Sequence, residues 1–154
     1  MSPFLWDVEA GRKWLQKIST DGGVVMVPRV LVIEDNPYSL DLMVYVLQAY
    51  GYTPLIARDG GEGIERALAD LPDLILCDIQ LPVQDGYEVA KRLKAEPTTA
   101  AIPLVAVTAM AMVGDREKVL AVGFDAYITK PIQPENFIAQ IEACFHPDGG
   151  MRRK

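Results

Sequence analysis

The sequence predicts an α/β fold in which a parallel sheet of five strands is covered by helices on both faces. Two observations lead to this prediction. Short apolar runs recur along the chain without alternation, each followed by polar or turn residues, which is typical of strands buried on both faces. Segments with helical spacing of apolar residues separate these runs, and a repeated strand–helix pattern produces a parallel sheet. The length of 154 residues suits one such domain.

Five strands are expected, three from clear signals and two from weaker ones. The clear apolar runs cover residues 30–33, 74–77 and 104–107. The weaker runs cover residues 52–57 and 125–129. Together they supply one strand for each repeat of the pattern.

A helix is expected after each strand. The first has Asn36 as a possible cap and Pro37 in its first turn, and its apolar stripe ends before Gly51. The last begins near Pro134 and continues to about Phe145. The helices between them are expected at residues 61–70, 87–95 and 112–122.

Composition excludes several classes of protein. No apolar run approaches the roughly 18 residues of a membrane span, and the charged start does not resemble a signal peptide, so we expect a cytoplasmic protein without a membrane partner. The net charge of −6 argues against nucleic-acid binding. Cys77 and Cys144 lie in apolar segments and are expected to be small hydrophobic residues rather than a disulfide or metal pair.

The ends of the chain do not share the repeating pattern. Residues 1–28 hold both tryptophans but add no strand, and we treat them as an extension or linker. Residues 29–146 form the expected domain, and residues 147–154 form a tail. Because only nine residues follow Phe145, output is expected to come from association with another protein.

Polar residues follow four of the five predicted strands. Glu34 and Asp35 follow the first strand, Asp78 the third, Thr108 the fourth and Lys130 the fifth. In a parallel sheet these positions share one rim, where ligand sites form. A cluster of three carboxylates persists only when a cation or a lysine neutralises it, and oxygen ligands of this kind suit Mg²⁺.

At these positions the sequence resembles the CheY-like receiver domain of bacterial response regulators. The matching segments are Val32-Ile33-Glu34-Asp35-Asn36, Asp78-Ile79-Gln80-Leu81-Pro82 with Asp85-Gly86, Val107-Thr108-Ala109 and Tyr127-Ile128-Thr129-Lys130-Pro131. The resemblance covers residues 29–145 and is similar in texture to DivK-type stand-alone regulators and to receivers of hybrid histidine kinases. It implies a flavodoxin-like (βα)5 three-layer sandwich with strand order 2-1-3-4-5.

The resemblance also implies a role for each matching residue. Asp78 is the expected phosphoacceptor, with Thr108 and Lys130 contacting the phosphoryl group. Glu34, Asp35, Asp78 and the backbone carbonyl of Gln80 are the expected Mg²⁺ ligands. Lys130-Pro131 is expected to be a cis peptide bond.

Two groups of residues are expected to act after phosphorylation. Thr108 and Tyr127, which are expected at the ends of neighbouring strands, are the expected switch residues that carry the signal to the surface of the protein. The resemblance also implies that Gln80 and Met110 flank the path of the hydrolytic water, although a plain packing or exposed-loop role fits Met110 as well.

The predicted function is therefore that of a single-domain response regulator in two-component phosphorelay signalling. It is expected to be no enzyme in the ordinary sense, but to catalyse its own phosphorylation and dephosphorylation. A histidine kinase or histidine phosphotransfer protein is the expected donor. The downstream partner is expected to bind the face formed by the helix at 112–122, the strand at 125–129 and the last helix.

Two alternatives stay open on the sequence alone. One is a scaffold receiver that binds partners without being phosphorylated, which the presence of all four polar positions disfavours. The other is an aspartyl-nucleophile phosphatase of the haloacid dehalogenase type. Such phosphatases carry a second aspartate two residues after the nucleophile, where this chain has Gln80.

Overall fold

A computed structural model describes residues 27–109 and 115–145, and these ranges contain the predicted five-stranded parallel sheet. The strands are β1 (Arg29–Ile33), β2 (Thr53–Ala57), β3 (Leu74–Asp78), β4 (Leu104–Thr108) and β5 (Ala126–Thr129). They are ordered β2-β1-β3-β4-β5, and each neighbouring pair is parallel. The predicted fold class and strand order are therefore confirmed.

Helices connect the strands as the pattern predicted. They are α2 (Pro37–Ala49), α3 (Gly60–Asp70), α4 (Gly86–Ala95), α5 (Asp115–Ala121) and α6 (Pro134–Phe145). Most boundaries fall within one or two residues of the predicted ones. The predicted helix at 112–122 is described only from residue 115, because residues 110–114 lie outside the described ranges. Within those ranges no helix is long and apolar enough to cross a membrane.

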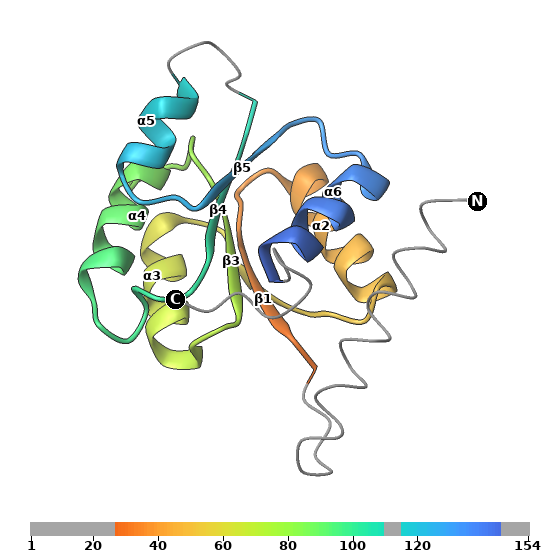
Figure 1. Cartoon of the computed structure of the whole chain (residues 1–154), viewed down its shortest axis with the longest axis horizontal. Helices are drawn as coiled ribbons and strands as arrows, with labels where there is room; N and C mark the ends of the chain where they lie inside the picture. The colour runs from red at the N-terminus through yellow and green to blue at the C-terminus, as the bar shows by residue number, and fades with distance from the viewer. Residues whose placement is uncertain (1–26, 110–114, 146–154) are drawn as a thin grey trace.

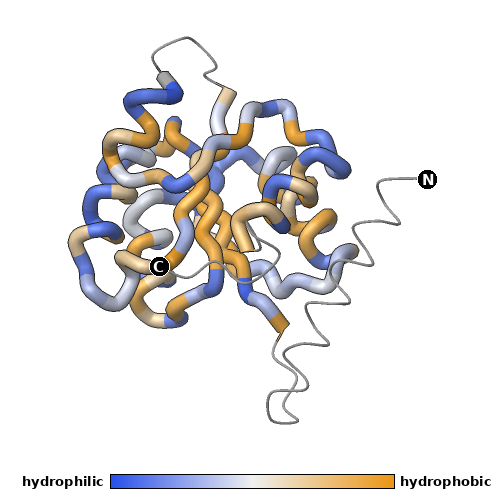
Figure 2. The backbone as a smooth tube through the Cα atoms, viewed as in Figure 1, coloured by the Kyte–Doolittle hydropathy of each residue, from blue (hydrophilic) through white to orange (hydrophobic). Residues whose placement is uncertain are grey.

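The helices form a layer on each side of the sheet. Helices α2 and α6 cover one face, and α3, α4 and α5 cover the other (Figure 1). Alternate residues of β1 serve the two layers: Val30 and Val32 pack with α2 and α6, whereas Leu31 and Ile33 pack with the opposite helices. The strands are accordingly the most apolar part of the backbone (Figure 2). This burial on both faces explains why their sequences do not alternate.

Side-chain caps fix where three helices begin. Asn36 Oδ1 accepts a hydrogen bond from Ser39 N at 3.0 Å, so the predicted cap of α2 is confirmed. Asp59 caps α3 and Asp85 caps α4 through the same kind of contact. These caps satisfy backbone donors that the first turn of a helix leaves unpaired. They also fix the loops that follow the carboxyl ends of β1, β2 and β3.

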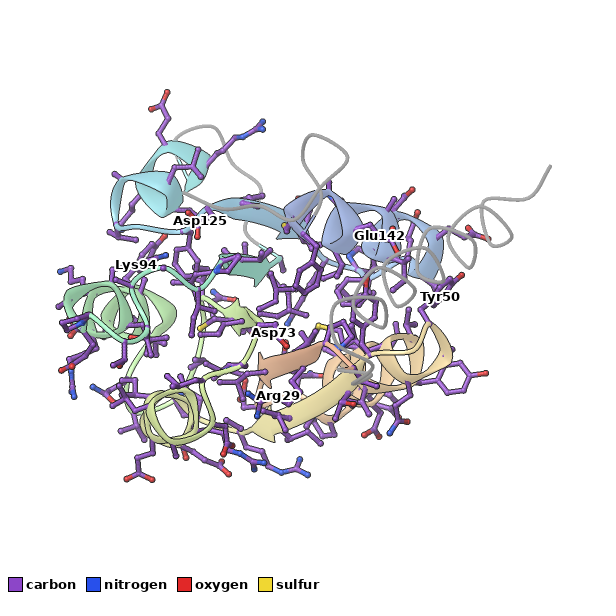
Figure 3. All side chains as sticks on the ribbon, turned by 60° about the horizontal axis from the view of Figure 1, so that its bottom comes forward. Arg29, Tyr50, Asp73, Lys94, Asp125 and Glu142 are labelled. Atoms are coloured by element: carbon purple, nitrogen blue, oxygen red, sulfur yellow. The ribbon has the colours of Figure 1, made fainter. Side chains whose placement is uncertain are left out.

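Polar contacts hold the opposite end of the sheet. Arg29 N donates to Asp73 Oδ2 at 2.8 Å, and Asp73 N donates back to Arg29 O at 2.8 Å. Lys94 Nζ lies 3.2 Å from Asp125 Oδ2, which also accepts from Leu104 N at 2.9 Å. Figure 3 shows both pairs. These contacts stabilise the end of the sheet where the strands begin. The polar residues that the sequence singled out lie at the opposite rim, where the strands end.

The two cysteines follow the prediction only in part. Cys77 is fully buried in β3, whereas Cys144 in α6 is only half-buried. Neither forms a disulfide.

Candidate functional site

The three predicted acids meet at one rim of the sheet. Glu34 and Asp35 follow β1, and Asp78 ends the neighbouring strand β3, where Ile33 is in register with Cys77. One carboxylate oxygen from each acid lies within 4.8 Å of the other two. Glu34 and Asp78 are buried, and Asp35 is exposed. The sequence therefore predicted this acidic cluster (Glu34, Asp35 and Asp78) correctly as a spatial group.

Lys130 reaches the acidic cluster from the edge of the sheet. It follows β5, and its Nζ lies 2.9 Å from Glu34 Oε1 and 3.0 Å from Asp78 Oδ2. The lysine side chain is only 16% exposed. The Lys130-Pro131 peptide bond is cis, as predicted. One ammonium group thus bridges the two buried carboxylates.

Backbone N–H groups hold the remaining oxygens of these acids. Gln80 N donates to Asp78 Oδ1 at 3.0 Å, and Asn36 N donates to Glu34 Oε2 at 3.1 Å. Hydrogen bonds from fixed backbone donors orient a carboxylate more tightly than solvent does. Asp78 is therefore held at both oxygens, by Gln80 N at one and by Lys130 at the other.

Gly86 allows the start of α4 to lie directly against Asp78. A Cβ atom at this position would be 2.6 Å from Asp78 O and 2.7 Å from Ile79 Cα. Gly86 N donates to Ile79 O at 2.8 Å, which closes the loop between β3 and α4. The glycine of the Asp85-Gly86 motif is thus required by the space around the backbone of Asp78.

Burial and proximity shift two of the charged groups. Burial raises the pKa of Glu34 to about 7, and the nearby Asp78 carboxylate contributes to the rise, although Lys130 opposes it. Burial by itself lowers the pKa of Lys130, but Glu34 and Asp78 outweigh it, so the net shift is upward. Lys130 therefore stays charged at neutral pH, while Glu34 lies near its midpoint.

The donor set at this rim fits a hard divalent cation. The acidic cluster offers three carboxylates against the single ammonium of Lys130, an excess of two negative charges when all are ionised. Carboxylate oxygens with an exposed side open to water are the ligands that Mg²⁺ prefers. Asp35 supplies that exposed side. Gln80 lies at the same rim, where its backbone N–H donates to Asp78.

The two predicted switch residues, Thr108 and Tyr127, lie on the neighbouring strands β4 and β5 but at different positions along them. Asp78 is in register with Val107, so Thr108 lies one residue beyond it on the adjacent strand, fully buried. Tyr127 is in register with Ala106, two residues before the end of β4. The prediction that both residues end their strands is therefore wrong for Tyr127, which is half-buried against the core on the α3, α4 and α5 side. Met110 lies outside the described residues.

Sequence reasoning missed two backbone contacts at this rim, from Gln80 N to Asp78 and from Asn36 N to Glu34. Asn36 was predicted only as a helix cap, yet its backbone N–H also orients Glu34. The signal was present in the sequence, because a residue that follows two acids and begins a helix has a backbone donor at the same rim.

Comparisons with known proteins agree with this geometry. Residues 30–142 match the family described as Response regulator receiver domain. The polar-differentiation response regulator DivK of Brucella ovis is 42% identical over 118 residues, which cover 77% of this chain and 96% of that protein.

Solved structures give the same result. The receiver domain of the sensor histidine kinase PA1611 from Pseudomonas aeruginosa, with a magnesium ion coordinated in its active site cleft, has a TM-score of 0.70 and 31% identity. The match covers 77% of this chain and 96% of that one. The chemotaxis protein CheY4 of Vibrio cholerae has a TM-score of 0.73 and 25% identity, covering 76% of this chain and 98% of that one.

Proposed function

The chain belongs to the receiver domain family of bacterial two-component response regulators, and from this premise we propose that Asp78 accepts a phosphoryl group from a phosphohistidine. We propose that it does so as a single-domain regulator of a phosphorelay. The observation that carries the proposal is the fixed position of Asp78. It is buried at the end of β3, with one oxygen held by Gln80 N and the other by Lys130 Nζ.

The reaction needs a nucleophile in a fixed position and positive charge around the transferred group. An Asp78 oxygen attacks phosphorus, the phosphorus–nitrogen bond of the phosphohistidine breaks, and the imidazole nitrogen that leaves takes a proton from solvent. Phosphoryl transfer places charge on the peripheral oxygens in the transition state, so positioning and neutralisation supply most of the catalysis. Lys130 supplies a fixed positive charge beside Asp78. Thr108, one residue beyond the register partner of Asp78, is placed to donate its hydroxyl to a phosphoryl oxygen.

We propose that Glu34, Asp35, Asp78 and the carbonyl of Gln80 hold Mg²⁺. When bound, the ion neutralises charge on phosphoryl oxygens. The acidic cluster supports this assignment by its oxygen donors and its excess negative charge. We also propose that the protein catalyses its own phosphorylation and dephosphorylation. The acidic cluster, Lys130 and Thr108, which would act on the phosphoryl group, all belong to this chain.

The proposed donor is a histidine kinase or a histidine phosphotransfer protein, and the proposed location is the cytoplasm. For output we propose the face formed by α5, β5 and α6. Two cavities of about 490 and 230 Å³ support the part of this face that β5 and α6 form, since residues of both elements line them and they share Ile128 and Gln140 in their walls. A phosphoryl group at Asp78 would reach this face through Thr108 on β4 and Tyr127 on β5.

The two alternative functions fit the site less well. A phosphatase of the haloacid dehalogenase type needs an acid two residues after the nucleophile, and Gln80 has no carboxylate. A scaffold receiver has no need for the buried ion pairs between Lys130 and the two acids.

Labelling with acetyl phosphate tests the proposed acceptor. The protein is incubated with acetyl phosphate and Mg²⁺, and the modified residue is located by mass spectrometry. Wild type and Asp59→Asn are expected to be labelled equally, because Asp59 caps α3 and does not belong to the acidic cluster. Asp78→Asn is expected to lose the label, and labelling of this variant at the wild-type rate would show that another residue is the acceptor.

A further inference from the structure

A groove runs along the open edge of β5. This strand is the last of the sheet, and among the described strands it pairs only with β4. Helix α6 lies beside it (Figure 1), and residues of both elements line the two cavities of about 490 and 230 Å³. Because the two cavities share Ile128 and Gln140 in their walls, we treat them as one feature, the β5–α6 groove.

The β5–α6 groove has apolar walls and a negative end. Ile128 and Ala143 lie in its walls. Where β5 begins, the groove is lined by Asp125, whose Oδ2 pairs with Lys94. Helix α6 contains no lysine or arginine, and its last carbonyls, before it ends at Phe145, add the negative end of the helix dipole. An occupant should therefore present an apolar face along the groove and basic residues at this end.

The chain itself contains a segment with these properties. In residues 4–18, which lie outside the described ranges, apolar side chains recur every three or four positions, with Gly11 at the centre of the series: Phe4, Val8, Leu15 and Ile18. This spacing predicts an amphipathic helix. A helix of about 15 residues is only marginally stable in water by itself, so its apolar stripe needs a surface to cover. We call residues 4–18 the N-terminal segment.

The N-terminal segment can reach the groove from its attachment point. Val27 precedes β1 and Asp125 precedes β5, so in a parallel sheet both lie at the same end. The strand order places β1 and β5 three strand spacings apart, about 14 Å. Residues 19–26 can span about 26 Å when extended, which is more than enough.

Length and charge also agree with this placement. As a helix the N-terminal segment would be about 22 Å long, and the 12 residues of α6 extend over about 18 Å. Its basic residues are all in its second half, the half closer to Val27: Arg12, Lys13 and Lys17. They would therefore lie at the end of the groove formed by Asp125 and the last turn of α6, where negative charge favours them.

We propose that the N-terminal segment folds as a helix in the β5–α6 groove of its own chain and covers part of the proposed output face until a partner displaces it. This regulatory role rests on the proposed function, because it assumes that the face serves for output. A partner that needs the uncovered face binds more weakly by the ratio of docked to undocked molecules. Couplings of this kind are typically about 5- to 150-fold.

The protein has a natural reporter on each side of the proposed contact. Both tryptophans of the chain, Trp6 and Trp14, belong to the N-terminal segment, so tryptophan emission reports on its surroundings alone. Cys144 lines the groove and is half-buried, whereas Cys77, the other cysteine, is fully buried. Labelling of the folded protein with N-ethylmaleimide therefore reports on Cys144.

Matched variants of the full chain test the contact from both sides. Leu15→Asp places a charge in the apolar stripe, and its control, Gln16→Asp, places the same charge on the polar face of the predicted helix. Ala143→Arg fills the groove with a large side chain. Its control is Ala95→Arg, because Ala95 is also exposed but ends α4, on the opposite face of the sheet (Figure 1).

Tryptophan emission should show that the N-terminal segment is docked in wild type. We expect emission at shorter wavelength from the wild-type protein than from a synthetic peptide of residues 1–26, because docking places the indole rings beside apolar groups. Leu15→Asp and Ala143→Arg should move the emission toward that of the peptide. Gln16→Asp and Ala95→Arg should leave it at the wild-type position. Equal urea midpoints would show that all four variants are folded.

Thiol labelling should show that the groove is covered. Cys144 is expected to react about tenfold faster in Leu15→Asp than in wild type, toward the lower end of typical couplings. Gln16→Asp should react at the wild-type rate. These rates should not depend on protein concentration, because the contact lies within one chain.

Three results would overturn the inference. One is an equal labelling rate of Cys144 in Leu15→Asp and wild type, and another is wild-type emission identical to that of the peptide. The third is protection of Cys144 that grows with protein concentration, which would assign the groove to a second copy of the chain.

Labelling of Asp78 by acetyl phosphate, run in parallel, separates this inference from the proposed function. If Asp78 is labelled while Cys144 is unprotected, the inference fails and the acceptor assignment stands. If Asp78 is not labelled, the proposed function falls, and the regulatory role of the N-terminal segment falls with it.

Discussion

Replacement of Lys130 by methionine tests whether one ammonium group neutralises the buried acids. Lys130 Nζ lies 2.9 Å from Glu34 Oε1 and 3.0 Å from Asp78 Oδ2, and both carboxylates are buried. Methionine has a similar length but no charge. In Lys130→Met the carboxylates of Glu34 and Asp78 would face each other without the ammonium group. The nearby Asp35 carboxylate would add to their repulsion.

The size of the effect follows from the burial of these groups. Removing one partner of a buried ion pair typically costs about 3–5 kcal/mol of stability, because the remaining charge is buried and uncompensated. We expect a value near the lower end, about 3 kcal/mol, because the pKa of Glu34 is already raised to about 7 and the group can take up a proton. A domain of this size has a total stability of about 6–17 kcal/mol, so the variant should still fold.

Urea unfolding in buffer that contains EDTA measures this cost. With a urea m-value of about 1.5–2 kcal/mol/M, the midpoint should fall by about 1.5–2 M. Lys118→Met is the control, since its Nζ lies 4.7 Å from the centre of the Tyr87 ring, a contact that contributes about 0.5–1 kcal/mol. Adding Glu34→Gln to Lys130→Met should recover part of the loss, because it removes one of the two repelling charges. A midpoint no lower than that of Lys118→Met, or a further loss in the double variant, would refute the reasoning.

Three further predictions concern other parts of the fold. Gly86→Ala should lower stability by about 1–3 kcal/mol and slow labelling by acetyl phosphate, because its Cβ atom would lie 2.6 Å from Asp78 O. The control Gly61→Ala should have neither effect, because its Cβ has no contact closer than 3.5 Å. Equal urea midpoints for the two variants would contradict this prediction. Thr108→Ala should still be labelled at Asp78, but phosphorylation should no longer raise its affinity for the partner by the about 5- to 150-fold expected in wild type. Titrations of both forms measure the ratio of phosphorylated to unphosphorylated affinity, and the same ratio in wild type and variant would exclude Thr108 as a switch. Removal of residues 1–25 should leave cooperative unfolding and labelling intact if residues 29–146 are the receiver domain, and loss of cooperativity would show that the first 28 residues belong to it.

The sequence predicted the parts of this structure that depend on local pattern. The uninterrupted apolar runs identified β1, β3 and β4, because a strand buried on both faces needs no polar positions. The cap at Asn36 followed from the preference of helix starts for side-chain oxygens. The meeting of Glu34, Asp78 and Lys130 followed from the common rim of parallel strands.

The remaining features depend on distances that no local pattern encodes. Tyr127 lies opposite Ala106 rather than at the end of its strand, because the register between β4 and β5 is set by the packing of the whole sheet. The positive φ of Val83 could not be predicted, because valine disfavours it and the surrounding loop imposes it. The backbone donors that hold Glu34 and Asp78 were also missed. The helix start at Asn36 indicated a donor near Glu34, but nothing in the sequence showed that Gln80 N points at Asp78.

The division of labour within the fold follows from where each group is anchored. Asp78 and Thr108 end strands that are almost fully buried, and Lys130 is held by two ion pairs, so their positions are determined by the core. Tyr38 and Val83 are instead exposed, so packing among the described residues does not constrain their identities.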